Sequence, residues 1–373
     1  MALLAEVIEL LDEWYPPGFA DDWDRVGLVL GDPTEEVRRI LLAVDPVQAV
    51  ADEAVEAGAD LIICHHPLFL RGVNPMAATT AKGRLAHLLV SSGIALFTAH
   101  TNADAPADGV SQAIAEALQL ERIRPLEADP TEPLDKIVVF VPIADAERVR
   151  QALAEAGAGA IGDYDSCSFQ TEGTGRFRPL AGANPTIGAV GELESVPEVR
   201  LEVVAARAQR RTVLAALRSA HPYEEPAFDV IELAALDEPG RGSGRIGELA
   251  TPVSLAQFAA RVGEVLPQTA HGVRVAGDPD QLISKVALCG GAGDFLLPRA
   301  RAAGADVYVT SDLRHHPVSE FREESTTAVI DVAHYAAESM WLPVLREKLR
   351  AALADRVEVV ISRVNTDPWT FRA

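Results

Sequence analysis

Residues 39–69 read RILLAVDPVQAVADEAVEAGADLIICHHPLF, and this stretch decides the expected fold. Two short apolar runs, ILLAV and LIIC, enclose an alanine-rich segment of helical character. A third apolar run, IALF at 94–97, follows another such segment. Strands this apolar are typical of a sheet buried on both faces. The region from Arg39 to about Leu120 therefore predicts successive strand and helix units of an α/β fold.

The same alternation of expected strands and helices is found again from Lys285 onward. Strands are expected at KVALC (285–289), DVYVT (306–310) and AVIDV (328–332), and helices near 294–303, 316–324 and 334–354. The two ends of the chain are therefore expected to form a two-part α/β core, made of residues 1–130 and residues 239–373.

An inserted domain is expected between these halves, at 131–238. It begins after the polar stretch EADPTEPLDK (127–136) and ends at DEPGRGSGRIG (237–247), and both stretches are typical of linkers. We expect strands or strand material at 137–141, 164–170, 187–193, 201–205 and 227–233, and helices at 145–156 and 210–220. This β-α-β-β-α-β order predicts a ferredoxin-like α+β domain.

Composition limits the functional classes. The chain has 373 residues, 48% of them apolar, and a formal net charge of -22. Such a charge disfavours binding to nucleic acid or to anionic lipid. Cys64, Cys167 and Cys289 are odd in number and far apart, which argues against a disulfide framework. The start, MALLAEVIELLDEW, lacks a basic region and reads as an amphipathic helix, and no apolar run reaches ~18 residues. We expect a cytoplasmic protein without a membrane partner.

Adjacent histidines follow the strand LIIC. His65 and His66 stand where ligand sites of open α/β sheets are found, just beyond the carboxyl end of a strand. Consecutive side chains diverge, so each imidazole could serve a different metal ion. An isolated HH dipeptide is more often a pair of hydrogen-bonded surface imidazoles.

Two further pieces repeat this pattern. His100 and Asp104 follow the run IALF, although Asp104 could equally be a turn or capping residue. His334 and Glu338 are four residues apart at the start of an expected helix and so share one face, although most such pairs are simply solvated. The recurrence of such residues at two strand ends favours a common metal site. Its nitrogen and oxygen ligands suit Zn, Fe, Mn or similar ions.

Other polar clusters can also be explained by structural roles. Asp312, His315 and His316 follow another strand and could line the same crevice as supporting groups or as a proton shuttle, or could only cap a helix. The glycines of LCGGAGDF (288–295) favour a tight turn over an anion site.

Two more clusters are read as structural. Trp23, Asp24 and Gly27 are more easily explained by packing and turn formation than by a site. In the insert, HPYEEPAFDV (221–230) favours a structured turn over a site.

These motifs together resemble the Nif-three-like dinuclear metal-centre family, whose members are labelled GTP cyclohydrolase 1 type 2 homologues. The resemblance covers nearly the whole chain. It is carried by WDRVGL (23–28), HHPLF (65–69), HTNADA (100–105), HPYEEPAFDV (221–230), CGGAG (289–293), TSDLRHH (310–316) and DVAHYAAE (331–338).

The resemblance implies a ligand set for two divalent metal ions per subunit, with Glu338 bridging the ions. The implied ligands are His65, His66, Asp104, His334 and Glu338. It also implies a toroidal homohexamer and an insert similar to the PII and CutA fold. One departure is visible: the family often has a Tyr-His-Asp triplet where this chain has His315, His316 and Pro317. His316 keeps the position of the family's histidine, but the carboxylate is missing.

Paired metal ions favour hydrolysis, because they lower the pKa of a bound water and clamp an oxygen-rich substrate. The leading hypothesis is a metal-dependent hydrolase of a nucleotide or related heterocycle, similar to GTP cyclohydrolase. The candidates for an acid or base are His100 and His316. Two alternatives are a metal-dependent phosphoesterase and a non-enzymatic metal-binding hexamer with a regulatory or scaffold role.

Overall fold

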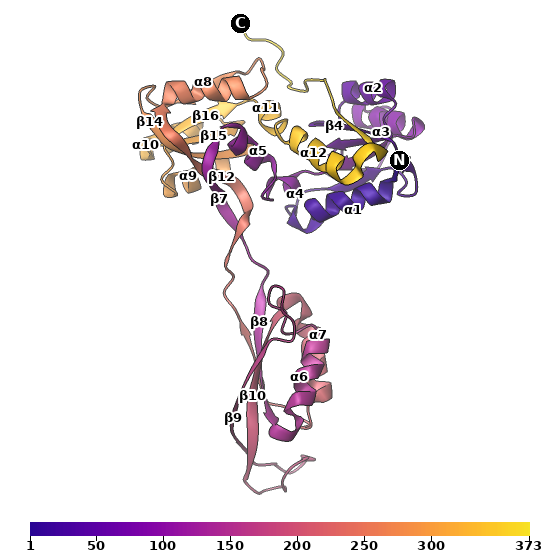
Figure 1. Ribbon diagram of the computed structural model, residues 1–373, viewed down its shortest axis with the longest axis vertical. Helices are drawn as coiled ribbons and strands as arrows, with labels where there is room; N and C mark the ends of the chain where they lie inside the picture. The colour runs from indigo at the N-terminus through magenta and orange to yellow at the C-terminus, as the bar shows by residue number, and fades with distance from the viewer. The chain divides into compact units, whose positions relative to one another are not determined.

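The structure is a computed structural model that describes all 373 residues. The chain divides into two compact units (Figure 1). Unit 1 comprises Met1–Asp129 and Pro239–Ala373, and unit 2 comprises Pro130–Glu238. No helix is long and apolar enough to cross a membrane.

Unit 1 has a mixed α/β fold with two main sheets. The first has five strands in the order β17-β4-β5-β6-β2. Strands β17, β4, β5 and β6 run parallel, and β2 is antiparallel to β6. Their bounds are β2 Gly27–Leu30, β4 Arg39–Ala43, β5 Leu61–Cys64, β6 Ala95–Thr98 and β17 Glu358–Ile361. The last strand of the chain thus pairs with a strand of the first third.

The second sheet of unit 1 has six strands in the order β13-β16-β15-β14-β12-β7. Strands β14, β15 and β16 are parallel, whereas β12 and β13 are antiparallel to their partners β14 and β16. The bounds are β7 Leu120–Pro130, β12 Asp237–Ser254, β13 Val273–Ala276, β14 Leu282–Ala292, β15 Val307–Ser311 and β16 Ala328–Val332. A small ladder pairs β1 (Ala2–Leu3) with β3 (Glu36–Val37).

One apolar core joins the two sheets. It contains Ile63 and Phe97 from the first sheet, Val309 and Ile330 from the second, and Trp341. The helices that contribute to it are α1 Leu4–Trp14, α5 Val110–Ala117, α8 Leu255–Val265, α11 His334–Glu338 and α12 Trp341–Leu353. The halves of unit 1 therefore share buried surface, which fixes the strand ends of one sheet against those of the other.

Separate clusters cover the outer faces of the two sheets. Helices α2 (Gln48–Ala57) and α3 (Ala81–Ser91) pack on the first sheet around Leu41 and Ile62. Helices α9 (Leu297–Ala302) and α10 (His315–Glu324) pack on the second sheet around Tyr308. The alternation of strand side chains between two buried faces explains why these strands are apolar throughout.

Unit 2 is a four-stranded sheet with two helices. Its elements are β8 Leu134–Pro142, α6 Ala146–Glu155, β9 Ser168–Phe177, β10 Glu194–Ala206, α7 Arg210–Ala220 and β11 Phe228–Glu232. The strand order is β11-β8-β10-β9, with every neighbouring pair antiparallel. Val139 and Leu201 pair across β8 and β10 and lie in a core with Leu153 and Leu217 of the two helices.

Three expected elements differ in the structure. Residues 187–193 contain no strand and belong to the irregular connection between β9 and β10. The helix expected at 334–354 is interrupted between α11 and α12. Because of this break, Pro343 falls in the first turn of α12, where its missing N–H removes no helical hydrogen bond.

The third difference is the glycine-rich stretch at 237–247, which lies in β12 and is not a linker loop. Its glycines permit close contact between backbones. A Cβ atom on Gly242 would lie 2.1 Å from the carbonyl oxygen of Glu127, and one on Gly244 would lie 2.7 Å from that of Leu288. Glycine in a strand interior commonly marks such an approach.

Candidate metal centre

The predicted site residues follow strand ends of unit 1. His65 and His66 come directly after β5, and His100 comes just after the neighbouring parallel strand β6. Asp104 ends the short helix α4 (Thr101–Asp104). Because β5 and β6 are parallel, their carboxyl ends meet at one edge of the sheet. Helix α11, which follows β16 of the other sheet, brings residues of the last third to this edge.

Glu338 lies at the centre of the cluster, and its side chain is only 4% exposed. Its Oε1 atom is 2.7 Å from His334 Nε2 and 3.5 Å from His65 Nε2. Its Oε2 atom is 3.0 Å from His66 Nε2. Asp104 Oδ1 is 3.8 Å from His65 Nε2. The structure thus brings together the five side chains that the resemblance implied as ligands.

The other ring nitrogen of each histidine makes a fixed hydrogen bond. His65 Nδ1 donates to the carbonyl oxygen of Ala99 at 2.9 Å, because a carbonyl can only accept. His66 Nδ1 donates to Asp45 at 2.7 Å. His334 Nδ1 donates to Asp312, also at 2.7 Å. A hydrogen on Nδ1 leaves Nε2 as the ligand atom, and partners of this kind orient metal-binding histidines.

Two buried atoms at the centre make no hydrogen bond, namely His65 Nε2 and Glu338 Oε2. Buried polar atoms without a partner are rare and need an explanation. Two ligand atoms that are each ~2.1 Å from a tetrahedral zinc ion lie about 3.4 Å apart. The separations of 2.7 to 3.8 Å around Glu338 and Asp104 are close to that value. The residues therefore fit a divalent metal ion.

Two overlapping groups in the cluster could each hold one metal ion. One consists of His65, His66 and His100, and the other of His66, His334 and Glu338. In each group the ligand atoms lie within 4.8 Å of one another. The donor set is mainly imidazole with carboxylate, which suits first-row transition metals better than magnesium or calcium.

The electrostatics of the cluster favour positive charge. Burial raises the pKa of the Glu338 carboxyl, but the surrounding imidazoles outweigh burial and hold this pKa well below its ordinary value. Burial opposes the charged form of His66, yet Glu338 and Asp45 raise its pKa to about 10. Burial also opposes the charged form of His334, but the carboxylates of Asp312 and Glu338 raise its pKa to about 11. A cation at the centre would satisfy the same carboxylates.

His65 and Asp104 show the opposite tendency, since each is disfavoured as a charge. Burial lowers the pKa of His65, which favours the neutral imidazole that binds metals. Burial, followed by the charge of Glu338, raises the pKa of Asp104 well above its ordinary value, although its side chain is 35% exposed. The charges of His66 and His334 oppose this rise in the pKa of Asp104 but do not outweigh it.

Asp24 belongs to the site, contrary to its expected packing role. Its Oδ1 accepts the Nδ1–H of His100 at 2.8 Å, and its Oδ2 accepts the Thr101 hydroxyl at 2.6 Å. The exposed Trp23 ring meets His100 edge-on at 5.9 Å. The His100 ring in turn lies 5.2 Å from the ring of His65. Asp24 and His100 therefore form a carboxylate–imidazole pair beside the proposed metal ligands.

The structure does not connect His316 to the cluster. His315 and His316 are exposed at the start of α10, with their rings 5.1 Å apart. Neither makes a hydrogen bond or ion pair with the cluster. Asp312, from the same stretch, does support the site through His334.

Sequence reasoning missed Asp45 and Thr366. Asp45 follows β4 in the sequence LLAVDP, so the rule that located His65 and His100 at strand ends would also have found it. The Thr366 hydroxyl donates to Asp45 Oδ2, and no local signal marks this residue, because the contact spans 321 positions. The backbone of Gly291 also lies close to the site. A Cβ atom added at Gly291 would lie 2.6 Å from Glu338 Oε1.

Comparisons with known proteins agree with this description. The family described as Duf34/NIF3 (NGG1p interacting factor 3) matches residues 2–368. A Mycobacterium leprae protein named GTP cyclohydrolase 1 type 2 homolog is 50% identical, over 100% of this chain and 96% of the relative. A Bacillus subtilis protein of the same name is 39% identical over 98% of both chains.

Solved structures give the same result. The crystal structure of a Bacillus cereus protein related to NIF3 is similar, with a TM-score of 0.74 and 35% identity, over 100% of this chain and 99% of that one. A Staphylococcus aureus crystal structure has a TM-score of 0.83 and 29% identity, with the same coverage.

Proposed function

The chain belongs to the Duf34/NIF3 family, and on that premise we propose that it is a metal-dependent hydrolase of a nucleotide or related heterocycle. The proposed cofactor is a pair of divalent ions, Zn, Fe or Mn. The observation that carries the proposal is the convergence on Glu338 of imidazole nitrogens from both terminal thirds. Its Oε2 atom and His65 Nε2 are buried there without a hydrogen bond.

The distances between the proposed ligand atoms suggest how the ligands are shared between the two ions. His65 and Asp104 would hold one ion, because His65 Nε2 lies 3.8 Å from Asp104 Oδ1, and His66 and His334 would hold the other, because their Nε2 atoms lie 3.3 Å apart. Glu338 Oε1 lies near both His65 and His334, and its Oε2 lies near His66, so this carboxylate would contact both ions. Asp45 and Asp312 keep Nε2 of His66 and His334 free for binding.

Paired divalent ions supply a bound water of lowered pKa and a clamp for oxygen-rich substrates. The chain itself would supply proton transfer. His100 is the better-placed of the two proposed acid–base residues, because its ring lies 5.4 Å from the ring of His66 and is oriented by Asp24. A histidine held by a carboxylate in this way keeps one tautomer and can exchange a proton through Nε2.

Two further parts of the proposal concern the assembly. Unit 2 would be a ferredoxin-like insert, supported by its β-α-β-β-α-β order and by its strand order β11-β8-β10-β9. The protein would form a homohexamer, as the family resemblance implied. A light-scattering mass of six times 39.8 kDa is the expected result.

The metal assignment is tested with Glu338→Gln, which keeps the volume of this buried side chain and removes its charge. Metal-free protein is loaded with Zn²⁺ or Mn²⁺, desalted and analysed for metal per chain. We expect two ions per chain in the wild type and loss of at least one in the variant. The matched control is His87→Ala, which removes an exposed histidine on α3. Two ions retained in Glu338→Gln would overturn the assignment.

The reaction is tested with GTP, because the relatives carry the name GTP cyclohydrolase 1 type 2 homolog. Metal-loaded protein is incubated with GTP, and formate and phosphate are measured separately. Formate release supports cyclohydrolase chemistry, whereas phosphate release without formate supports the phosphoesterase alternative. Turnover must be lost in Glu338→Gln. Intact metal binding without turnover across a nucleotide panel would contradict the hydrolase proposal and support a regulatory or scaffold role.

A further inference from the structure

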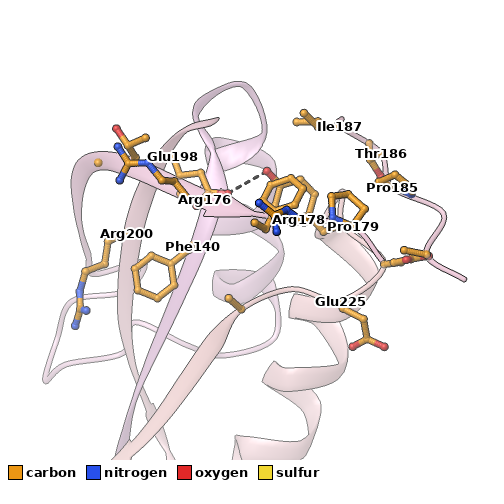
Figure 2. A pocket seen from close by; sticks show the side chains of 18 of the residues that line it. Phe140, Arg176, Arg178, Pro179, Pro185, Thr186, Ile187, Glu198, Arg200 and Glu225 are labelled. Carbon is orange, nitrogen blue, oxygen red and sulfur yellow. Dashed lines mark hydrogen bonds between the residues drawn. The ribbon is translucent and has the colours of Figure 1, made fainter. Parts of the chain in front are cut away.

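Unit 2 contains a cavity of about 710 Å³ that has no part in the metal centre (Figure 2). Val139 and Leu201 of its sheet face the two helices, so their neighbours Phe140 and Arg200 point to the opposite face. There the connection at 178–187 closes over the sheet and lines the cavity. This volume lies within the range of ligand-binding pockets, which is roughly 300–1,000 Å³.

Two contacts hold this connection in place. The Thr186 hydroxyl donates to the carbonyl oxygen of Pro222 at 2.7 Å, and the Asn184 backbone N–H donates to Glu224 at 3.0 Å. The stretch 221–230, for which the sequence predicts a structured turn, therefore also forms a wall of the cavity.

Glycines of β9 leave the cavity open. A Cβ atom on Gly173 would meet no atom within 4 Å, so a larger side chain there would extend into empty space. A Cβ atom on Gly175 would lie only 2.0 Å from Glu198 Oε2. The missing side chain at Gly175 thus allows the Glu198 carboxylate to lie against the strand, at the cavity wall.

Glu198 is the buried polar group of the cavity, with the residue 7% exposed. Its Oε1 accepts the hydroxyl of Tyr223 at 3.0 Å, and no basic side chain forms an ion pair with it. A buried carboxylate without a cation is costly unless hydrogen-bond donors reach it. Its second oxygen is therefore suited to accept an N–H group from a ligand.

Arginine and aromatic side chains complete the lining of the cavity. Arg178 lines the cavity and has no carboxylate partner in the structure, in a chain whose net charge is -22. Arg200 pairs with Glu202 and lies over the Phe140 ring at 5.8 Å. Further aromatic surface comes from Phe177 and Tyr223, whose rings are 5.5 Å apart.

We propose that this cavity binds a nucleoside monophosphate. The aromatic rings would contact the planar base, Glu198 would accept an N–H of the base, and Arg178 would bind the phosphate. Glu172, Glu224 and Glu225 also line the cavity, and their negative charge disfavours a polyphosphate. The proposal does not depend on the metal centre or on its chemistry.

The experiment uses the full-length protein and GMP as the probe, with calorimetric titration before and after removal of metal. Guanosine and inorganic phosphate are titrated separately. We expect one GMP per chain in both metal states, with weaker binding of guanosine and of phosphate. Gly173→Val fills the cavity and suits a strand, because φ at 173 is ordinary and valine is β-branched.

Gly173→Val and Arg178→Gln should each weaken GMP binding at least tenfold. The matched control is Arg211→Gln, an exposed arginine on α7 outside the cavity, which should bind GMP like the wild type. Metal content and thermal unfolding are measured in each variant to verify folding.

Three results would overturn the proposal. One is the absence of GMP binding at millimolar concentration, and another is unchanged binding in Gly173→Val. The third is loss of GMP binding in Glu338→Gln but not in Gly173→Val, which would assign the nucleotide to the metal centre. A change in oligomeric mass in Gly173→Val without GMP binding by the wild type would assign this face to a second copy of the chain.

Discussion

Replacing Asp45 by asparagine tests how much this hydrogen-bond partner contributes to metal binding by His66, one of the proposed ligands. Asp45 Oδ1 accepts the Nδ1–H of His66 at 2.7 Å, and its negative charge makes the opposite Nε2 a better donor to a cation. Asparagine keeps the shape of the side chain but loses the charge. Outer partners of this kind typically contribute 10- to 100-fold in metal affinity, which is about 1.4 to 2.8 kcal/mol.

The assay is a competitive titration of metal-free protein with Zn²⁺ in the presence of a chelator, which resolves two binding constants. We expect Asp45→Asn to weaken the constant of the His66 site 10- to 100-fold and to change the other constant much less. The control is Asp52→Asn, because Asp52 accepts a hydrogen bond from Gln48 on the surface of α2, away from the ligands. The reasoning is refuted if both constants are unchanged, or if the control weakens them equally.

Three further predictions follow from single contacts. Thr366→Val should lower zinc affinity less than Asp45→Asn does, and Thr366→Ser should restore it in the same titration, because only the hydroxyl contacts Asp45. Gly291→Ala should lower metal content and the melting temperature, since φ at 291 is +68° and the new methyl would crowd Glu338. His221 should make stability depend on pH: burial lowers its folded-state pKa, so the unfolded chain binds more protons and stability falls as pH drops below 6.5. Thermal unfolding at pH 7.5 and at pH 5.5 checks this, and an equal pH dependence in His221→Asn would contradict it.

Local patterns in the sequence predict the strands that carry the site. The run LIIC before His65 and the run IALF near His100 have the apolar character of buried strands, and β5 and β6 lie there. Polar residues directly after such strands can only emerge at a sheet edge, which makes His65, His66 and His100 candidates. The same local rule applies to Asp45, although a single aspartate before proline also suits a turn.

No local sequence pattern indicates the contacts between residues that are far apart in the chain. Strand β17 pairs with β4 more than 300 positions away in sequence, and Thr366 reaches Asp45 across a similar separation. The glycine-rich start of β12 reads as a linker, because the partner backbone that requires glycine is visible only in the folded chain. The role of Asp24 depends likewise on a contact with His100 across 76 positions.

Anomalous diffraction from crystals of the zinc-loaded protein, recorded on both sides of the zinc absorption edge, would locate bound metal without any assumption about activity. Two strong peaks ~3.5 to 4 Å apart, one on each side of the Glu338 carboxylate, are the expected outcome. One ion should contact His65 and the other His66 and His334. Peaks located elsewhere, or no peak at Glu338 in fully loaded protein, would contradict the account.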